Sequence, residues 1–213
     1  MHEVRLAFLA AAGAARPILG LPEVLERWEE PSALARMSIG ALAAHLARAV
    51  STVETYLDKN VRHSGEEPMS AAGYYAAVVS RGGSDLDSEA NVAVRERADK
   101  AATGGGRSVL EGFEKSLTHL RGRLGAEPDD RLVEVYGNYV LPLDEYLTTR
   151  VIELTLHTDD LCVSVGHATP TLPGVEATIA TLVAVAEIRH GEVAVLRALA
   201  RRERDDEKAL RVL

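Results

Sequence analysis

Residues 147–165 read LTTRVIELTLHTDDLCVSV and carry the pattern that decides how this chain folds. As a helix with about 100° per residue, this segment places a polar stripe along one face. Successive members of the stripe lie four or three residues apart: Tyr146, Arg150, Glu153, His157, Asp160 and Ser164. Apolar side chains flank the stripe on one side (Leu147, Val151, Leu154, Leu161 and Val165) and on the other (Ile152, Leu156 and Val163). The stripe is therefore predicted to lie in the middle of the buried arc.

Charged side chains in a buried arc need a partner, because an unpaired charge in a protein interior is costly. A metal ion or a polar substrate is the usual partner of such a stripe. The opposite side of the helix carries Thr148, Thr155 and Asp159, which we expect to face solvent. The segment thus predicts a helix that contributes a polar site to the interior of the protein.

The composition of the whole chain favours an all-α fold. Ala, Leu, Glu and Arg are abundant among the 213 residues, whereas aromatic residues make up 4%. This length suits one domain over residues 1–213, with a helical appendage at about 171–213.

Helical patterns recur along the chain and are separated by segments rich in Gly and Pro. The predicted helices span residues 3 to about 28, 38–60 with Ser38 as N-cap, 88 to about 124 with a break in TGGGR at 103–107, 174–190, and 192 to about 205. Residues 125–141 are predicted to form a loop with a short extended piece, after which Pro142 opens the helix that carries the stripe.

The connection over residues 60–88 is unusually long for a helical bundle. Its MSAAGYYAAVVS segment is predicted to make two turns of helix. Such a connection suits a crossover between parallel neighbours rather than a tight antiparallel turn.

Charge and hydropathy exclude several classes of function. The formal net charge is -8, and RALARRER near the end is the one conspicuous basic block, so nucleic acid is not an expected partner. No apolar run reaches about 18 residues, so no membrane span is expected. The apolar N-terminal segment is predicted to be the first helix rather than a signal peptide. The single cysteine, Cys162, excludes an internal disulfide and fits a reducing cytoplasm.

Two residues of the stripe have the spacing of metal ligands. Glu153 and His157 are four residues apart on the predicted helix, so both side chains can reach one ion. His45, at the edge of the apolar arc of the helix at 38–60, is the natural third ligand. Two imidazole nitrogens and one carboxylate oxygen suit zinc with one open position. The alternative is an ion-pair network within the stripe that binds no metal.

The other charged residues of the stripe each allow two interpretations. Arg150 either holds a substrate carboxylate or forms a structural salt bridge with Glu153 or Asp160. Asp160 either accepts a hydrogen bond from a ligand histidine or completes the coordination sphere. We consider Arg150 and Asp160 to be the candidate catalytic residues.

Two segments of the chain resemble signatures of one known family. RWEEPSALARMSIGALAAHLARAV at 27–50 resembles the "W-x-x-P-S-x-L…(S/T)-(I/V)-x-x-L-x-x-H-L" segment of the mycothiol-dependent maleylpyruvate isomerase N-terminal-domain family, within the DinB-like superfamily. YLTTRVIELTLHTDDL at 146–161 resembles its second signature, "T-R-x-x-E-x-x-x-H-x-x-D-L". The ending RHGEVAVLRALARRERD is similar to the tails of many actinobacterial members.

This resemblance implies a fold, a metal site and a thiol cofactor. The implied fold is a DinB-like up-down-down-up four-helix bundle, and the implied ligands of a divalent metal, usually zinc, are His45, Glu153 and His157. The implied thiol is mycothiol, which adds to an unsaturated diacid in the founding isomerase and is transferred to electrophiles by related proteins. The founding isomerase also has a C-terminal α/β domain, whereas the residues after Pro170 here are predicted to be helical.

The sequence therefore predicts a metal-dependent enzyme that uses a low-molecular-weight thiol as nucleophile. Its expected partners are mycothiol and a small electrophilic substrate that carries a carboxylate. A non-catalytic protein that binds a metal or a small molecule is the alternative. A closed four-ligand site would favour the binding protein, and an open site beside a polar cavity would favour the enzyme. The oligomeric state, monomer or homodimer, stays open.

Overall fold

The protein is described here by a computed structural model that covers residues 2–59, 67–82, 85–200, 203 and 210. Most of the described chain is helical, as predicted. The helices are α1 (Glu3–Leu19), α2 (Pro22–Glu26), α3 (Ile39–Leu57), α4 (Ala71–Gly82), α5 (Glu89–Ala102), α6 (Gly105–Arg123), α7 (Leu143–Val165), α8 (Val175–His190) and α9 (Glu192–Ala200). The strands β1 (Leu132–Glu134) and β2 (Val140–Pro142) form one short antiparallel pair. Within the described residues, none of the helices is long and apolar enough to cross a membrane.

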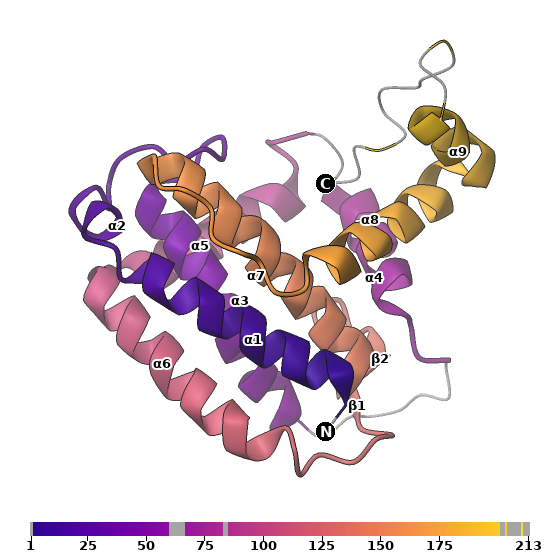
Figure 1. Cartoon of the computed structure of the whole chain (residues 1–213), viewed down its shortest axis with the longest axis horizontal. Helices are drawn as coiled ribbons and strands as arrows, with labels where there is room; N and C mark the ends of the chain where they lie inside the picture. The colour runs from indigo at the N-terminus through magenta and orange to yellow at the C-terminus, as the bar shows by residue number, and fades with distance from the viewer. Residues whose placement is uncertain (1, 60–66, 83–84, 201–202, 204–209, 211–213) are drawn as a thin grey trace.

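Helices α1, α3, α6 and α7 form the bundle, and the large hydrophobic core lies between them (Figure 1). The N-terminal ends of α3 and α6 meet at Trp28, whose ring lies against Gly40 and Gly106, so these two helices run parallel. At the other end, buried Arg5 of α1 donates to the carbonyl of Leu124, after α6, and to Asp144 in the first turn of α7. Helices α1 and α7 therefore begin where α6 ends, which confirms the up-down-down-up order.

The crossover from α3 to α6 contains α4, a helix of 12 residues where two helical turns were predicted, and α5, which lies in the region 88–124 that was predicted to be helical. Ser38 caps α3 as predicted, accepting a hydrogen bond from the amide of Ala41 at 3.0 Å. The predicted region 88–124 is divided at Gly104 and Gly105, and the φ of +76° at Gly105 explains why glycine stands there. The crossover places α4 against α7 and α5 against α3.

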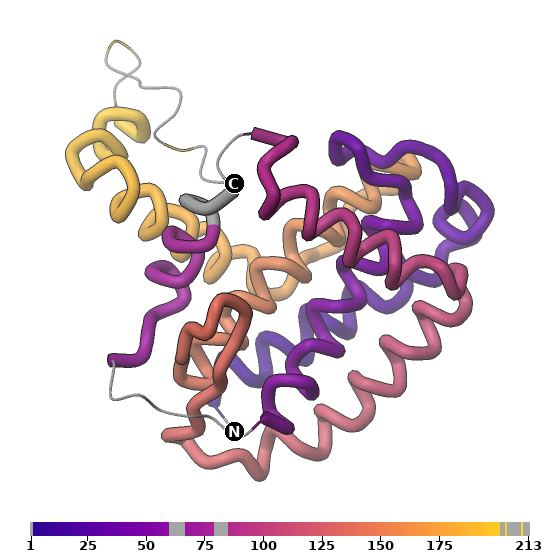
Figure 2. The backbone as a smooth tube through the Cα atoms, turned by 180° about the vertical axis from the view of Figure 1, so that it is seen from behind, coloured from indigo at the N-terminus to yellow at the C-terminus, as the bar shows by residue number. Residues whose placement is uncertain are grey.

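The appendage consists of α8 and α9, which meet at Gly191 as predicted (Figures 1 and 2). Both views show α9 at the extreme end of the molecule, beyond α8. A second, smaller hydrophobic cluster joins this appendage to the crossover, with Tyr75 and Ala76 of α4, Ile152 of α7, Val185 and Ala186 of α8, and Val195 of α9. Parts of the predicted connection at 60–88 and of the C-terminal segment lie outside the described residues.

Candidate metal centre

Three side chains from two helices meet where α3 packs against α7. His45 of α3 and Glu153 and His157 of α7 each offer one ligand atom, and these atoms lie within 4.8 Å of one another. Glu153 Oε2 lies 3.3 Å from Nε2 of His45 and 3.4 Å from Nε2 of His157. The two imidazole rings meet edge to face, with centroids 4.7 Å apart. The structure thus brings together the three residues that the sequence selected as candidate ligands.

The local sequence explains this meeting. Residues 153 and 157 are one helical turn apart, so α7 directs both side chains to the same side. Helix α3 contacts α7, and His45 is flanked on α3 by buried Ala44 and Leu46. The cluster is only partly shielded, with side-chain exposures of 21% for His45, 20% for Glu153 and 17% for His157. A small ligand can therefore reach it from solvent.

The carboxyl group of Glu153 is ionised in this cluster. Burial opposes its ionisation, but hydrogen bonds from His157 and His45 and the charge of Arg150 hold its pKa well below the ordinary value. Its second oxygen, Oε1, accepts a hydrogen bond from the hydroxyl of Tyr75 at 2.5 Å. Tyr75 was not selected from the sequence, because only the packing of α4 on α7 shows that it reaches Glu153.

Asp160 lies beside the cluster and contacts the far side of a ligand ring. Its Oδ2 is 2.9 Å from Nδ1 of His157, which leaves Nε2 directed toward Glu153. Burial lowers the pKa of His157, but the carboxylates of Asp160 and Glu153 outweigh burial and raise it to about 9. Of the two roles left open for Asp160, the geometry matches that of a partner that orients a ligand histidine.

Arg150 makes its close contacts with Thr149 and Tyr146. Among the described residues, no carboxylate lies within ion-pair distance of its guanidinium, although its charge contributes to the lowered pKa of Glu153. Instead, Nε donates to the hydroxyl of Thr149 at 3.0 Å, and the guanidinium lies 5.0 Å from the ring centroid of Tyr146. The arginine is held in place while its charge remains available to a ligand.

A cavity of about 230 Å³ adjoins the cluster. His45 and Glu153 form part of its wall, and the other charged side chains in the wall are those of Arg48, Arg97 and Arg150. Tyrosines supply much of the remaining polar surface: Tyr56, Tyr74, Tyr136 and Tyr146. In a chain with a formal net charge of -8, a cavity lined by three arginines is a local positive site that suits an anion.

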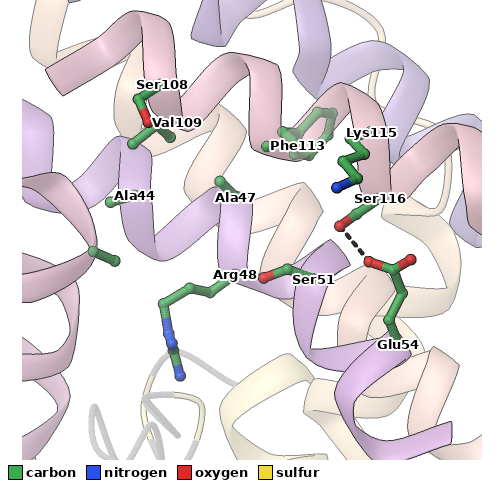
Figure 3. A pocket seen from close by; sticks show the side chains of 12 residues that line it. Ala44, Ala47, Arg48, Ser51, Glu54, Ser108, Val109, Phe113, Lys115 and Ser116 are labelled. Carbon is green, nitrogen blue, oxygen red and sulfur yellow. Dashed lines mark hydrogen bonds between the residues drawn. The ribbon is translucent and has the colours of Figure 1, made fainter. Parts of the chain in front are cut away.

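A second cavity, of about 350 Å³, lies between α3, α5 and α6. Arg48 belongs to the walls of both cavities. Figure 3 shows its side chain extending away from Val109 and Phe113 of α6, and the hydrogen bond from Ser116 to Glu54. The cluster of His45, Glu153 and His157 does not line this cavity, so the first cavity is the candidate ligand site.

Two predictions about the faces of α7 are wrong. Thr155, expected to face solvent, is 4% exposed, and Val163, expected in the buried arc, is 60% exposed. Helix α7 is contacted by α1, α3, α4 and α8, so its buried surface extends around more of the helix than one apolar arc. Gly174 illustrates the crowding, since a Cβ there would lie 2.4 Å from a methyl group of Val151.

Comparisons with known proteins give one family and one fold. The sequence model of one protein family, the mycothiol maleylpyruvate isomerase N-terminal domain, matches residues 8–162. This range includes His45, Glu153 and His157 and ends before α8. The chain is similar to the solved structure of a histidine-to-alanine mutant of mycothiol-dependent maleylpyruvate isomerase. The TM-score is 0.54 with 16% identity, over 86% of this chain and 68% of that chain, which shows a common all-α, DinB-like fold. No curated protein matches the chain.

Proposed function

The chain belongs to the mycothiol maleylpyruvate isomerase N-terminal domain family, and from this we propose a metal- and mycothiol-dependent enzyme that acts on a small electrophile bearing a carboxylate. The observation that supports the proposal most strongly is the open cluster of His45, Glu153 and His157 beside an arginine-lined cavity. Isomerisation of the substrate and transfer of the thiol to it are the two reactions that this chemistry allows.

The donor set fits a divalent metal. Two imidazole nitrogens and one carboxylate oxygen form the three-protein-ligand set of many catalytic zinc sites, which keep one position for water or substrate. Glu153 Oε2 is near both Nε2 atoms, so the three donors face a common point. Asp160 is engaged with Nδ1 of His157 and does not join this set, which favours an open site over a closed four-ligand one.

A divalent ion bound by these residues would lower the pKa of a coordinated thiol, so that the thiolate of mycothiol is available at neutral pH. The residues of the chain supply the rest of the mechanism. Asp160 fixes the ring of His157 through Nδ1. Arg150, held against Tyr146, binds a carboxylate of the electrophile and so directs its reactive carbon toward the thiol. Tyrosine hydroxyls in the cavity wall offer further hydrogen bonds to the substrate.

A thiol-addition assay tests the proposal. Zinc-loaded protein is given mycothiol and either an α,β-unsaturated dicarboxylate or its diester, and both thiol consumption and cis–trans conversion are followed. We expect turnover of the dicarboxylate to exceed that of the diester. In Arg150→Gln, we expect KM for the dicarboxylate to rise by about tenfold or more, because a charge-assisted contact is lost. A loaded protein that neither consumes thiol nor converts any unsaturated acid in a broad panel would contradict the enzyme and favour a binding protein.

A further inference from the structure

Glu153 presents its two carboxylate oxygens to different partners. Oε1 accepts a hydrogen bond from Tyr75 at 2.5 Å, whereas Oε2 lies 3.3 Å from His45 and 3.4 Å from His157. The Tyr75 hydroxyl is also 3.2 Å from the backbone carbonyl of Thr149, one turn before Glu153 on α7. The phenol therefore sits against α7 on the side of Glu153 away from the two imidazoles.

Packing fixes the ring of Tyr75 in this position. Tyr75 is 6% exposed and belongs to the second hydrophobic cluster, where it is joined by Ile152 of α7, Val185 of α8 and Val195 of α9. The ring of Tyr74, on the same helix, lies edge to face with it at 6.3 Å. The hydroxyl of Tyr75 is the donor in its contact with Glu153, because a carboxylate oxygen only accepts.

We infer that Tyr75 is a positioning residue that occupies Glu153 Oε1 and thereby presents only Oε2 to a metal shared with the two histidines. The inference rests on the proposed function, since it gives Tyr75 a role only if the cluster binds metal. Helices α8 and α9 lie beyond residue 162, where the family match ends. Their side chains form part of the second hydrophobic cluster, which packs around Tyr75. The appendage is thus connected to the metal centre through α4.

The expected size of the effect follows from the place of Tyr75 behind a ligand. Partners that orient metal ligands typically contribute about 10–100-fold to metal affinity. Without the hydroxyl, Glu153 Oε1 loses its donor, and the carboxylate can turn or coordinate through both oxygens. Both changes alter the geometry around the ion as well as the affinity.

The test uses Co²⁺ as the probe, because its visible absorption depends on coordination geometry. Metal-free wild type, Tyr75→Phe and Tyr139→Phe are titrated with Co²⁺, and spectra are recorded at saturation. We expect Tyr75→Phe to bind Co²⁺ about 10–100-fold more weakly and with a changed spectrum. Tyr139→Phe removes a phenol hydroxyl from a residue that lines neither the cluster nor the adjoining cavity, and it should keep the affinity and spectrum of the wild type.

Val195→Ala is a second variant. It keeps the hydroxyl of Tyr75 and removes part of the hydrophobic packing around that residue. We expect its Co²⁺ affinity to fall in the same direction as that of Tyr75→Phe, by a smaller factor. Circular dichroism checks that each variant is folded. Tight binding by wild type with unchanged affinity and spectrum in Tyr75→Phe would overturn the role of Tyr75 and leave the proposed function intact. Wild type that takes up no Co²⁺ or Zn²⁺ would overturn both.

Discussion

His157 is contacted by carboxylates at both ends of its ring. Asp160 lies 2.9 Å from Nδ1, and Glu153 lies 3.4 Å from Nε2. Together they raise the pKa of His157 to about 9 against the lowering effect of burial. A metal can bind only the deprotonated Nε2, so in the metal-free protein the proton on His157 competes with the ion. Asp160 and Glu153 orient the ring of His157 as a ligand. Because they also raise its pKa, they make metal binding depend on pH.

We expect the stability of the metal-free protein to fall as pH rises from 6.5 to about 9. The pKa of His157 is raised above its ordinary value of 6.5, so protonated His157 stabilises the fold fully below pH 6.5, and this contribution disappears as pH passes the folded pKa of about 9. The loss should not exceed about 3–4 kcal/mol, the value of a shift from 6.5 to about 9. Urea unfolding of chelator-treated protein at several pH values measures it.

The matched control for this prediction is His157→Gln, which cannot titrate at this position. Glu153 has a lowered pKa, so its contribution is lost only in acid and does not vary between pH 6.5 and 9. The stability difference between wild type and His157→Gln should therefore shrink across this range. Two curves that stay parallel from pH 6 to 9.5 would show that the pKa of His157 is not raised in the folded protein.

At the scale of elements, the start of α3 depends on one tryptophan and two glycines. The Trp28 ring lies against Gly40 of α3 and Gly106 of α6, and the amide of Gly40 donates to the carbonyl of Trp28 at 2.8 Å. A Cβ at residue 40 would lie 2.4 Å from the ring, so the ring or the helix would have to shift. This contact fixes the position of α3 along its axis relative to α6. It therefore also helps to position His45, which lies just over one turn after Gly40.

We expect Gly40→Ala to destabilise the protein by about 1–3 kcal/mol, because it overpacks this contact. Gly112→Ala is the matched control: it also lies within a helix, but a Cβ there meets nothing within 4 Å. Removing a flexible glycine from the middle of α6 should stabilise the protein by about 0.5–1 kcal/mol. Thermal unfolding monitored by circular dichroism gives both values. Equal effects in the two variants would contradict the packing explanation.

The helices themselves were predictable because their signals are local. Ser38 as N-cap, the glycines at 104–105 and the glycine at 191 mark helix ends through backbone preferences that act within a few residues. The pairing of Glu153 with His157 is local in the same sense, since helical spacing alone places them together. Tyr75 was not predictable, because α4 and α7 are far apart in sequence and only tertiary packing brings its hydroxyl to Glu153.

At the scale of the whole molecule, the proposed metal would join two helices of the bundle. Its ligands come from α3 and α7, which are separated in sequence by the crossover, by α6 and by the β1–β2 pair. The unfolded chain does not hold these ligands together, so a bound ion favours the folded state. The metal-free protein, in contrast, relies on the hydrophobic cores and on hydrogen bonds within the cluster.

Removal of the metal should therefore lower thermal stability. With free metal at a hundred times its Kd, the folded state should gain about 2.7 kcal/mol over the metal-free protein. Scanning calorimetry of zinc-loaded and chelator-treated wild type would show this as a rise in Tm, and Glu153→Ala should show no such rise. An identical Tm with and without zinc in wild type would mean that no ion binds the native fold preferentially.

Metal content tests the central claim most directly. Wild type, His45→Ala and His167→Ala are purified without added metal and measured by elemental analysis, with His167→Ala as a control that removes an exposed histidine outside the cluster. The account predicts about one zinc or other divalent ion per chain in wild type and in His167→Ala, and its loss in His45→Ala. Wild type without metal that takes up none from added zinc, or His45→Ala with full occupancy, would contradict it.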